Sequence, residues 1–423
     1  MKLKLCASPE EQEQSKLLIA ELMTNDVAAA KIEMFDVEYF CVYKDEEGCG
    51  CGGLLGPFTE LIDRGGAYLK ALRQLRWVSR CLQSEPLTRT VRWSSSRLVY
   101  PPLLTSLEER FPDLELNVEL PWGNPSPVRS SPLTHSLHVH FGPHQLDTTK
   151  TSPLLTHVQR QIMDSPNLVE LSMRVGSMGC VIYNVDPKFA RLRGKRFPPL
   201  EKLTLEAFPL SVKNVDYWMK NMDWSQMGNL DLRAIDEPTY FLNESLKLAD
   251  GLPQLKTLRI ELPWFDKAKD TQEFKDTFRR FLGAPRDTGL SEIALKGDYQ
   301  PYLQGILDKH GATLKTLLLH DPERPFEPQR TTLSELDLND IGRRAPNLEG
   351  ISVDINRTPN GTLVGPFVHS SMVIVSLSVA CDSQWNVWTR SYPRLNSHPY
   401  RPSSSSGSWG SLTSLRYQIG LMV

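Results

Sequence analysis

Apolar residues recur through the middle of this chain in triplets that are spaced three and then two residues apart. Residues 310–320, HGATLKTLLLH, contain one such triplet at Leu314, Leu317 and Leu319. A helix repeats its apolar positions every three or four residues and a strand every two, so the triplet combines both spacings. We expect the last two residues to point to one face of a short strand. The first residue would then cover the turn that leads into that strand.

The triplet occurs seven times, and successive copies begin 24 to 35 residues apart. This interval is typical of solenoid repeats. In four copies a proline lies two residues before the first apolar residue, and it ends the preceding helix because it cannot continue the hydrogen-bond ladder. The triplets are Leu168/Leu171/Met173, Leu200/Leu203/Leu205, Met227/Leu230/Leu232, Leu255/Leu258/Ile260, Leu290/Ile293/Leu295, Leu314/Leu317/Leu319 and Leu348/Ile351/Val353.

Each repeat is therefore predicted to be a helix, a proline turn, a short strand and a loop. Four segments upstream of the triplets carry apolar residues at helical spacing. They are residues 154–163, 271–282, 301–310 and 333–344. No single unit can bury its own leucines, so we expect the units to stack in parallel around one continuous core.

These residues resemble the leucine-rich-repeat family, in its longer, helix-bearing form like that of ribonuclease inhibitor. The seven triplets meet the family pattern Leu-x-x-Leu-x-Leu, but the asparagine that follows it in the family is missing or irregular here. The resemblance implies an α/β leucine-rich-repeat solenoid, a horseshoe with a parallel concave β-sheet and outer helices. The phrases HGATLKTLLLH and APNLEGISVDINR further resemble fungal F-box proteins, whose repeats follow an N-terminal F-box.

Three regions are predicted along the chain. Residues 1–64 form an irregular N-terminal cap with a helix over 9–23, a strand over 32–43 and a Gly-rich loop over 46–57. The solenoid covers 65–357, with degenerate repeats over 65–150 and clearer ones over 151–357. Residues 358–423 are a low-complexity tail, for which a partly disordered segment and a folded cap with a strand near 372–379 both stay open.

Composition limits the class of protein and its partners. The net charge is −2 and 40% of the residues are apolar, which fits a folded chain and argues against a nucleic-acid binder. No run of eighteen apolar residues and no signal peptide is found, and the seven cysteines show no disulfide pattern. We therefore expect a monomer in the cytoplasm or nucleus, with no membrane association.

Charged residues on the concave side of the predicted strands are the candidate binding site. The position after each triplet alternates in sign along most of the array, and neighbouring strands would place opposite charges side by side. Such a row can serve as a charge ladder that sets the register of the strands, as a mixed-charge surface for a protein partner, or as both. The candidate partner-binding residues are Arg174, Glu206, Asp231, Arg233, Arg259, Glu261, Lys296, His320 and Asp354.

Other candidate sites are weaker. His138 and His140 share one face of a predicted strand, but zinc needs three or four ligands, so His135, His138, His140 and His144 are expected to be ordinary strand histidines. Cys49 and Cys51 lack a second cysteine pair nearby. The basic run RLRGKRF at 191–197 is expected to be a solvated loop rather than a nuclear import patch or a contact for an acidic partner. No metal and no cofactor is predicted.

The predicted function is protein recognition without catalysis. The chain carries no G-x-S-x-G, P-loop, H-E-x-x-H or G-x-G-x-x-G motif that precedes a helix. The resemblance implies a substrate receptor of a cullin-type ubiquitin ligase that would bind the ligase adaptor through an F-box. No F-box is detected, because LLIAELM at 17–23 is the nearest match and lacks the proline. The alternative is a stand-alone interaction scaffold with no ubiquitin link.

Overall fold

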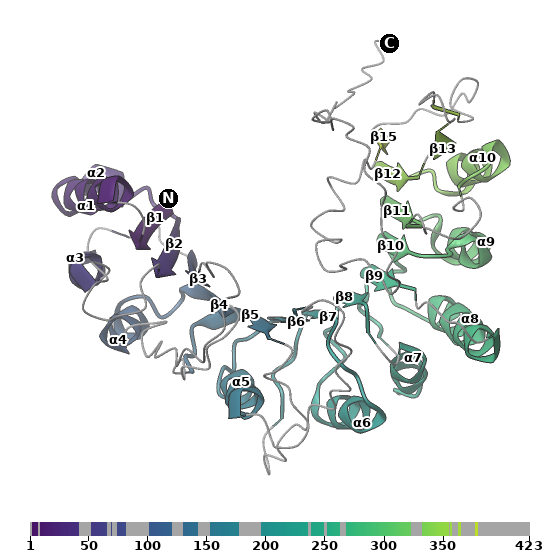
Figure 1. Ribbon diagram of the computed structural model, residues 1–423, viewed down its shortest axis with the longest axis horizontal. Helices are drawn as coiled ribbons and strands as arrows, with labels where there is room; N and C mark the ends of the chain where they lie inside the picture. The colour runs from purple at the N-terminus through teal and green to yellow at the C-terminus, as the bar shows by residue number, and fades with distance from the viewer. Residues whose placement is uncertain are drawn as a thin grey trace, which may run out of the picture.

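The computed structural model shows a solenoid built on one sheet of thirteen strands (Figure 1). The strands lie in sequence order and each pairs in parallel with the next, so every repeat adds one strand beside the previous one. The strands are β1 (Lys2–Cys6), β2 (Met34–Cys41), β3 (Gln74–Cys81), β4 (Glu115–Leu120), β5 (Thr134–Phe141), β6 (Glu170–Val175), β7 (Lys202–Glu206), β8 (Asn229–Arg233), β9 (Thr257–Glu261), β10 (Glu292–Lys296), β11 (Thr316–His320), β12 (Gly350–Val353) and β15 (Leu377–Val379).

The structure describes only part of the chain, in ranges separated by gaps. These ranges are residues 2–6, 9–41, 52–65, 69, 74–81, 101–120, 130–142, 153–176, 196–235, 238–248, 252–262, 268–322, 332–354, 356–357, 363–364 and 377–379. Within them, β13 (Asn356–Arg357) and β14 (Leu363–Val364) form a separate antiparallel pair.

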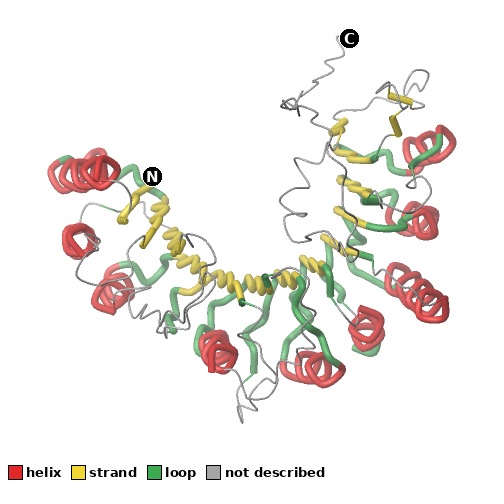
Figure 2. Tube along the Cα trace, viewed as in Figure 1, coloured by secondary structure: helices red, strands yellow, loops and turns green. Residues whose placement is uncertain are grey.

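The helices lie outside the arc of the sheet, which leaves the opposite, concave face to the strands (Figure 2). This arrangement confirms the predicted fold class, an α/β horseshoe with a parallel concave sheet and outer helices. The helices are α1 (Pro9–Thr24), α2 (Asp26–Ala29), α3 (Gly52–Gly65), α4 (Pro101–Arg110), α5 (Pro153–Met163), α6 (Val212–Asn221), α7 (Pro238–Leu246), α8 (Ala268–Gly283), α9 (Gln300–His310) and α10 (Glu335–Arg344). None of these described helices is long and apolar enough to cross a bilayer.

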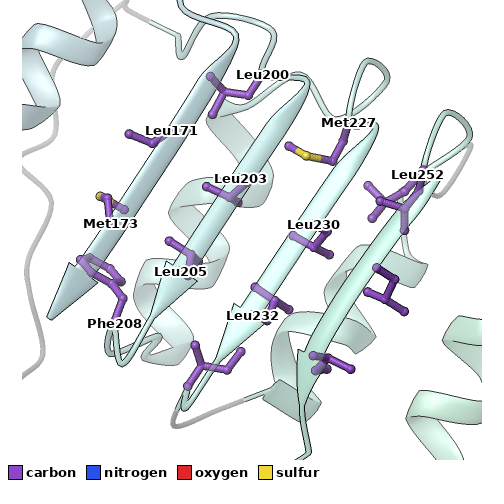
Figure 3. Close-up of a cluster of buried hydrophobic side chains, with 14 of the residues drawn as sticks. Leu171, Met173, Leu200, Leu203, Leu205, Phe208, Met227, Leu230, Leu232 and Leu252 are labelled. Atoms are coloured by element: carbon purple, nitrogen blue, oxygen red, sulfur yellow. The ribbon is translucent and has the colours of Figure 1, made fainter. Parts of the chain in front are cut away.

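The triplets form the core, as the spacing predicted. Leu171 pairs with Leu203, which pairs with Leu230, and this alignment stacks the apolar side chains strand by strand. These side chains are buried between the sheet and the helices (Figure 3). Burial of a leucine side chain is worth roughly 2 kcal/mol, so the summed rows hold the repeats together.

The proline turns carry an additional link between repeats. In the turn before β6, the side-chain amide of Asn167 donates from Nδ2 to the carbonyl oxygen of Pro132 at 2.8 Å. In the turn before β12, Asn347 donates in the same way to the carbonyl oxygen of Ala312 at 2.7 Å. Both asparagines precede the first apolar residue of their triplet, whereas the family pattern has its asparagine after the triplet.

The four predicted helical segments are confirmed as α5, α8, α9 and α10. α10 begins with a capping box, in which Ser334 and Asp337 each accept a hydrogen bond from the backbone N–H of the other. α6 and α7 were not located from the sequence.

The sheet is longer than the predicted solenoid. β1 and β2 pair in parallel and continue into β3, so the sheet starts at residue 2, inside the region 1–64 that was expected to be an irregular cap. The expected Gly-rich loop over 46–57 is wrong from Gly52 onward, because α3 begins there. Its buried residues Phe58, Leu61 and Ile62 explain why: the apolar face is helical in spacing and packs into the core despite the glycines.

At the other end, β15 pairs with β12 and extends the same sheet into the predicted tail 358–423. This strand lies within 372–379, where a final strand was one of the two alternatives. The other residues of the tail, apart from Leu363 and Val364, lie outside the described part of the chain.

Candidate partner-binding surface

Three rows of side chains point to the concave side of the sheet, because they alternate with the buried apolar residues of each strand. We call them the first, middle and last rows, in the direction of the strands. From β5 to β11, the first row is Ser136, Glu170, Lys202, Asn229, Thr257, Glu292 and Thr316; the middle row is His138, Ser172, Thr204, Asp231, Arg259, Ala294 and Leu318; the last row is His140, Arg174, Glu206, Arg233, Glu261, Lys296 and His320.

The last row is a ladder of ion pairs between neighbouring strands. Arg174 Nη2 lies 3.0 Å from Glu206 Oε1, and Arg233 Nη1 lies 3.6 Å from Glu206 Oε2. Lys296 Nζ lies 2.9 Å from Glu261 Oε1. The sequence predicted opposite charges beside each other at these positions, and the measured pairs have that arrangement.

The ladder continues to the end of the last row and into the middle row. His320 Nδ1 lies 2.9 Å from Asp354 Oδ1, at the residue directly after β12. Within β8, Arg233 Nε donates to Asp231 Oδ1 at 2.8 Å. Asp231 therefore shares the guanidinium of Arg233 with Glu206, and the two carboxylates lie on either side of it.

A second set of pairs involves the first row, which the sequence analysis did not select. Lys202 Nζ lies 2.7 Å from Glu170 Oε1, and His138 Nε2 lies 3.5 Å from the same oxygen. Arg259 Nε donates to Glu292 Oε1 at 2.8 Å. Most of the residues predicted from the sequence lie at the position after each triplet, whereas Glu170, Lys202 and Glu292 lie at the first strand position.

Burial differs sharply along the face. Towards the C-terminal end, the side chains of Lys296, His320 and Asp354 are only 5%, 6% and 1% exposed. These three predicted partner-binding residues are therefore too buried in this structure to contact a partner. Arg259, by contrast, is 37% exposed, so the accessible part of the ion-pair network lies over β5 to β9.

In this accessible part the cation of each cross-strand pair is more exposed than its carboxylate. The exposed fractions are 45% for Lys202 against 23% for Glu170, and 31% for Arg174 against 12% for Glu206. Arg259, at 37%, likewise exceeds Glu292, at 25%. The carboxylates therefore lie deeper and hold the cations in place, while the cations face solvent.

Burial also changes proton affinity in the last row. It raises the pKa of Glu206, even though Arg174 and Arg233 favour the charged carboxylate. Burial lowers the pKa of His140, an effect that Glu119 opposes from β4. His140 Nε2 lies 3.7 Å from Glu119 Oε1, so the imidazole has a carboxylate beside it to pair with once protonated.

The structure brings together no metal site from the described residues: no group of three histidine, cysteine, aspartate or glutamate side chains is placed to hold an ion. His138 and His140 share the concave face but pair with different carboxylates. His144, Cys49 and Cys51 lie outside the described ranges, as does 191–197 apart from its last two residues.

Comparisons with known proteins add little to this picture. No family model matches the sequence, and no curated protein matches it. Among solved structures, a protein from Bacteroides fragilis is 16% identical with a TM-score of 0.36, and the match covers 69% of this chain and 72% of that one. At this TM-score the likeness carries no argument, so the fold rests on the thirteen-stranded sheet itself.

Proposed function

We propose that this chain is a protein-recognition module that binds its partner on the concave face over β5 to β9. The observation that carries the proposal is the accessible network of ion pairs there, on the face opposite the helices. In solenoids the concave surface is wide and continuous, and such surfaces bind extended or folded partners. Arginine, which occurs here as Arg174 and Arg259, is also enriched among residues that dominate binding energy.

The residues proposed to contact the partner differ from those chosen from the sequence. Arg174 and Arg259 remain, and Lys202 joins them because its side chain is 45% exposed. Asp231, Arg233, Glu206 and Glu261 are more buried, at 20% or less, and of these Glu206 positions the exposed Arg174.

A bulky substitution in the middle row tests the proposal. Thr204 lies on β7 at the centre of the face and is partly exposed, so Thr204→Trp places an indole where the partner would lie. Val212→Trp is the matched control, since Val212 lies on α6 outside the arc and is 46% exposed. We expect Thr204→Trp to reduce capture of a natural partner on the order of tenfold, and Val212→Trp to leave it unchanged. Equal capture by both variants, with unchanged circular dichroism, would contradict binding on the concave face.

A finer role, as substrate receptor of a cullin-type ubiquitin ligase, is proposed on the F-box resemblance. The two phrases that carry the resemblance fold as β11 and β12, each after a helix, as repeats of that kind do. The test is a pull-down of the full chain with the purified ligase adaptor. Saturable binding supports the receptor role. Absence of binding at adaptor concentrations of tens of micromolar contradicts it and leaves the stand-alone scaffold.

A further inference from the structure

In the ion pairs of the β5 to β9 face, the cations are more exposed than the carboxylates that they contact. The formal charges of this face nearly cancel, but Glu170, Glu206 and Glu292 lie deeper than the cations they pair with. A partner that approaches the face therefore meets an ammonium and guanidinium groups before it meets a carboxylate. A charged side chain that is already held in place by a counter-ion costs little further ordering when a ligand binds.

Two of these cations have N–H groups that make no hydrogen bond to the described residues. Lys202 has three N–H donors and contacts only Glu170 among the described residues. Arg259 uses Nε and Nη2 on Glu292, which leaves Nη1 directed elsewhere, with no hydrogen-bond partner in the described part of the chain. Both groups can therefore donate a hydrogen bond to an additional anionic oxygen while they keep their ion pairs with Glu170 and Glu292.

We propose that the partner presents an extended acidic peptide segment to this face, with its carboxylates on Lys202 and Arg259 and a contribution from Arg174. The proposal rests on the proposed function and names the chemistry of the partner at the same site. Carboxylates are favoured because a guanidinium and an ammonium both bind them through charge-assisted hydrogen bonds.

The spacing of the two cations fits such a segment. Lys202 is in the first row on β7 and Arg259 in the middle row on β9. Their backbones are therefore about 10 Å apart across the strands and about 7 Å apart along them, or about 12 Å in all. An acidic peptide in extended conformation rises about 13 Å in four residues, and side chains four residues apart point the same way. A segment with glutamate at every fourth position would thus place one carboxylate near each cation.

The direct test measures binding of the full 423-residue chain to a fluorescent nine-residue peptide with glutamate at every fourth position. We expect saturable binding that weakens as salt rises from about 50 to 200 mM, and binding on the order of tenfold weaker for the same peptide with glutamine. Lys202→Gln and Arg259→Gln should each weaken binding about fivefold. Lys247→Gln is the matched control, because Lys247 also pairs with a glutamate but lies just beyond α7, away from the face.

Two outcomes would overturn the inference. One is equal binding of the glutamate and glutamine peptides, or no effect of Lys202→Gln and Arg259→Gln. The other is tighter binding of a single-stranded oligonucleotide of the same charge, which would make nucleic acid the ligand. If Thr204→Trp blocks capture of a natural partner while Lys202→Gln and Arg259→Gln do not, the proposed function stands and only the acidic chemistry fails.

Discussion

At the scale of single residues, the ends of the strands show backbone conformations that apolar patterning does not reveal. Ala207, Ala234 and Gly297 each follow a last-row residue, and their φ angles are +50°, +47° and +118°. The chain leaves the sheet here through the left-handed region, where a Cβ is disfavoured by roughly 1 kcal/mol. Gly297 meets this requirement, whereas the two alanines are strained.

Exchanging the residue types at these positions should change stability in opposite directions. Ala207→Gly relieves strain that exceeds the entropy cost of glycine in the unfolded chain, so we expect a gain of about 0.5 kcal/mol. Gly297→Ala should lose about 2 kcal/mol, because its Cβ would also lie 2.9 Å from Leu262 Cβ. Urea unfolding measures both changes, and a loss of stability in Ala207→Gly would show that Ala207 is not strained.

His310, the last residue of α9, is a buried link between repeats. Its Nδ1 accepts a hydrogen bond from the backbone N–H of Leu290 at 3.3 Å, and its Nε2–H donates to the carbonyl oxygen of Leu282 at 2.9 Å. The bond at Nδ1 needs the neutral imidazole, because a protonated Nδ1 cannot accept, whereas the Nε2–H bond forms in both states. The pKa of His310 is lowered to about 4, mainly by burial and also by nearby Arg286, while the bond to Leu282 opposes the shift.

This histidine should make the protein sensitive to mild acid. The unfolded chain, with a pKa near 6.5, takes up the proton more readily than the folded chain, so stability falls as the pH drops from about 6.5 towards 4. The full contribution is present above pH 6.5, and up to about 3 kcal/mol of it is lost near pH 4. We expect His310→Gln to show a flatter dependence of the urea midpoint on pH over this range. An unchanged slope would mean that His310 does not titrate as described.

At the scale of elements, the C-terminal end of α8 is held by a buried guanidinium. Arg286 donates from Nη1 and Nη2 to the carbonyl oxygens of Leu282, Ala284 and Phe281, and its guanidinium carbon lies 5.1 Å from the centre of the Phe281 ring. Carbonyls in the last turn of a helix lack the usual acceptor bonds from residues further along, and a cation at this end also favours the helix dipole. Burial lowers the pKa of Arg286 to about 10, so it stays charged at neutral pH.

Replacing this guanidinium with an ammonium should weaken the helix end. A lysine has one ammonium nitrogen and lacks the planar guanidinium that reaches all three carbonyls. Arg286→Lys should therefore lower the free energy of unfolding by about 2 kcal/mol. Arg280→Lys is the control: Arg280 is exposed and contacts Asn243 and Thr277 on the helix surface, so its change should stay within about 0.5 kcal/mol. Thermal unfolding compares the two variants, and equal losses would contradict a special role for Arg286.

At the scale of the whole molecule, stability is a sum of repeats and of the contacts between neighbours. Leu317 is fully buried on β11, where Ile293 and Ile351 flank it on the adjacent strands. Leu317→Asp would bury a charge between three repeats, at a cost of several kcal/mol. Backbone amide hydrogen exchange should then become faster in β10 to β12 while the amides of β6 to β8 stay protected. The reason is that each repeat is stabilised only by contacts with its adjacent repeats, so the loss of stability stays local.

Leu318→Asp provides the matched control at the adjacent position. Leu318 points to the concave side, is partly exposed and pairs laterally with Ala294 and Ser352. The same change of residue type should therefore cost less than about 1 kcal/mol. Equal damage from both substitutions would mean that the alternation of inward and outward residues on β11 is wrong.

The apolar triplets predicted the strands from β6 to β12 and which of their residues face the core. This worked because strand periodicity and proline turns are local properties of the chain. The first strands were harder to place. β1 and β2 belong to the sheet without carrying the triplet, and only the pairing of β1 with β2 and of β2 with β3 shows it. The glycines in the first turns of α3 made this segment look like a loop, although it forms a helix that packs against the neighbouring helices.

For the candidate site, the sequence alone determined the alternation of charge along the last row, since it follows from residue type and strand register. Only the tertiary structure decided how deep each charged group lies. It buries Lys296 and His320, exposes Lys202 and Arg259, and sets the carboxylates beneath the cations. Depth depends on side-chain packing across neighbouring strands and on the curvature of the sheet, and neither is encoded in the spacing of residues along one strand.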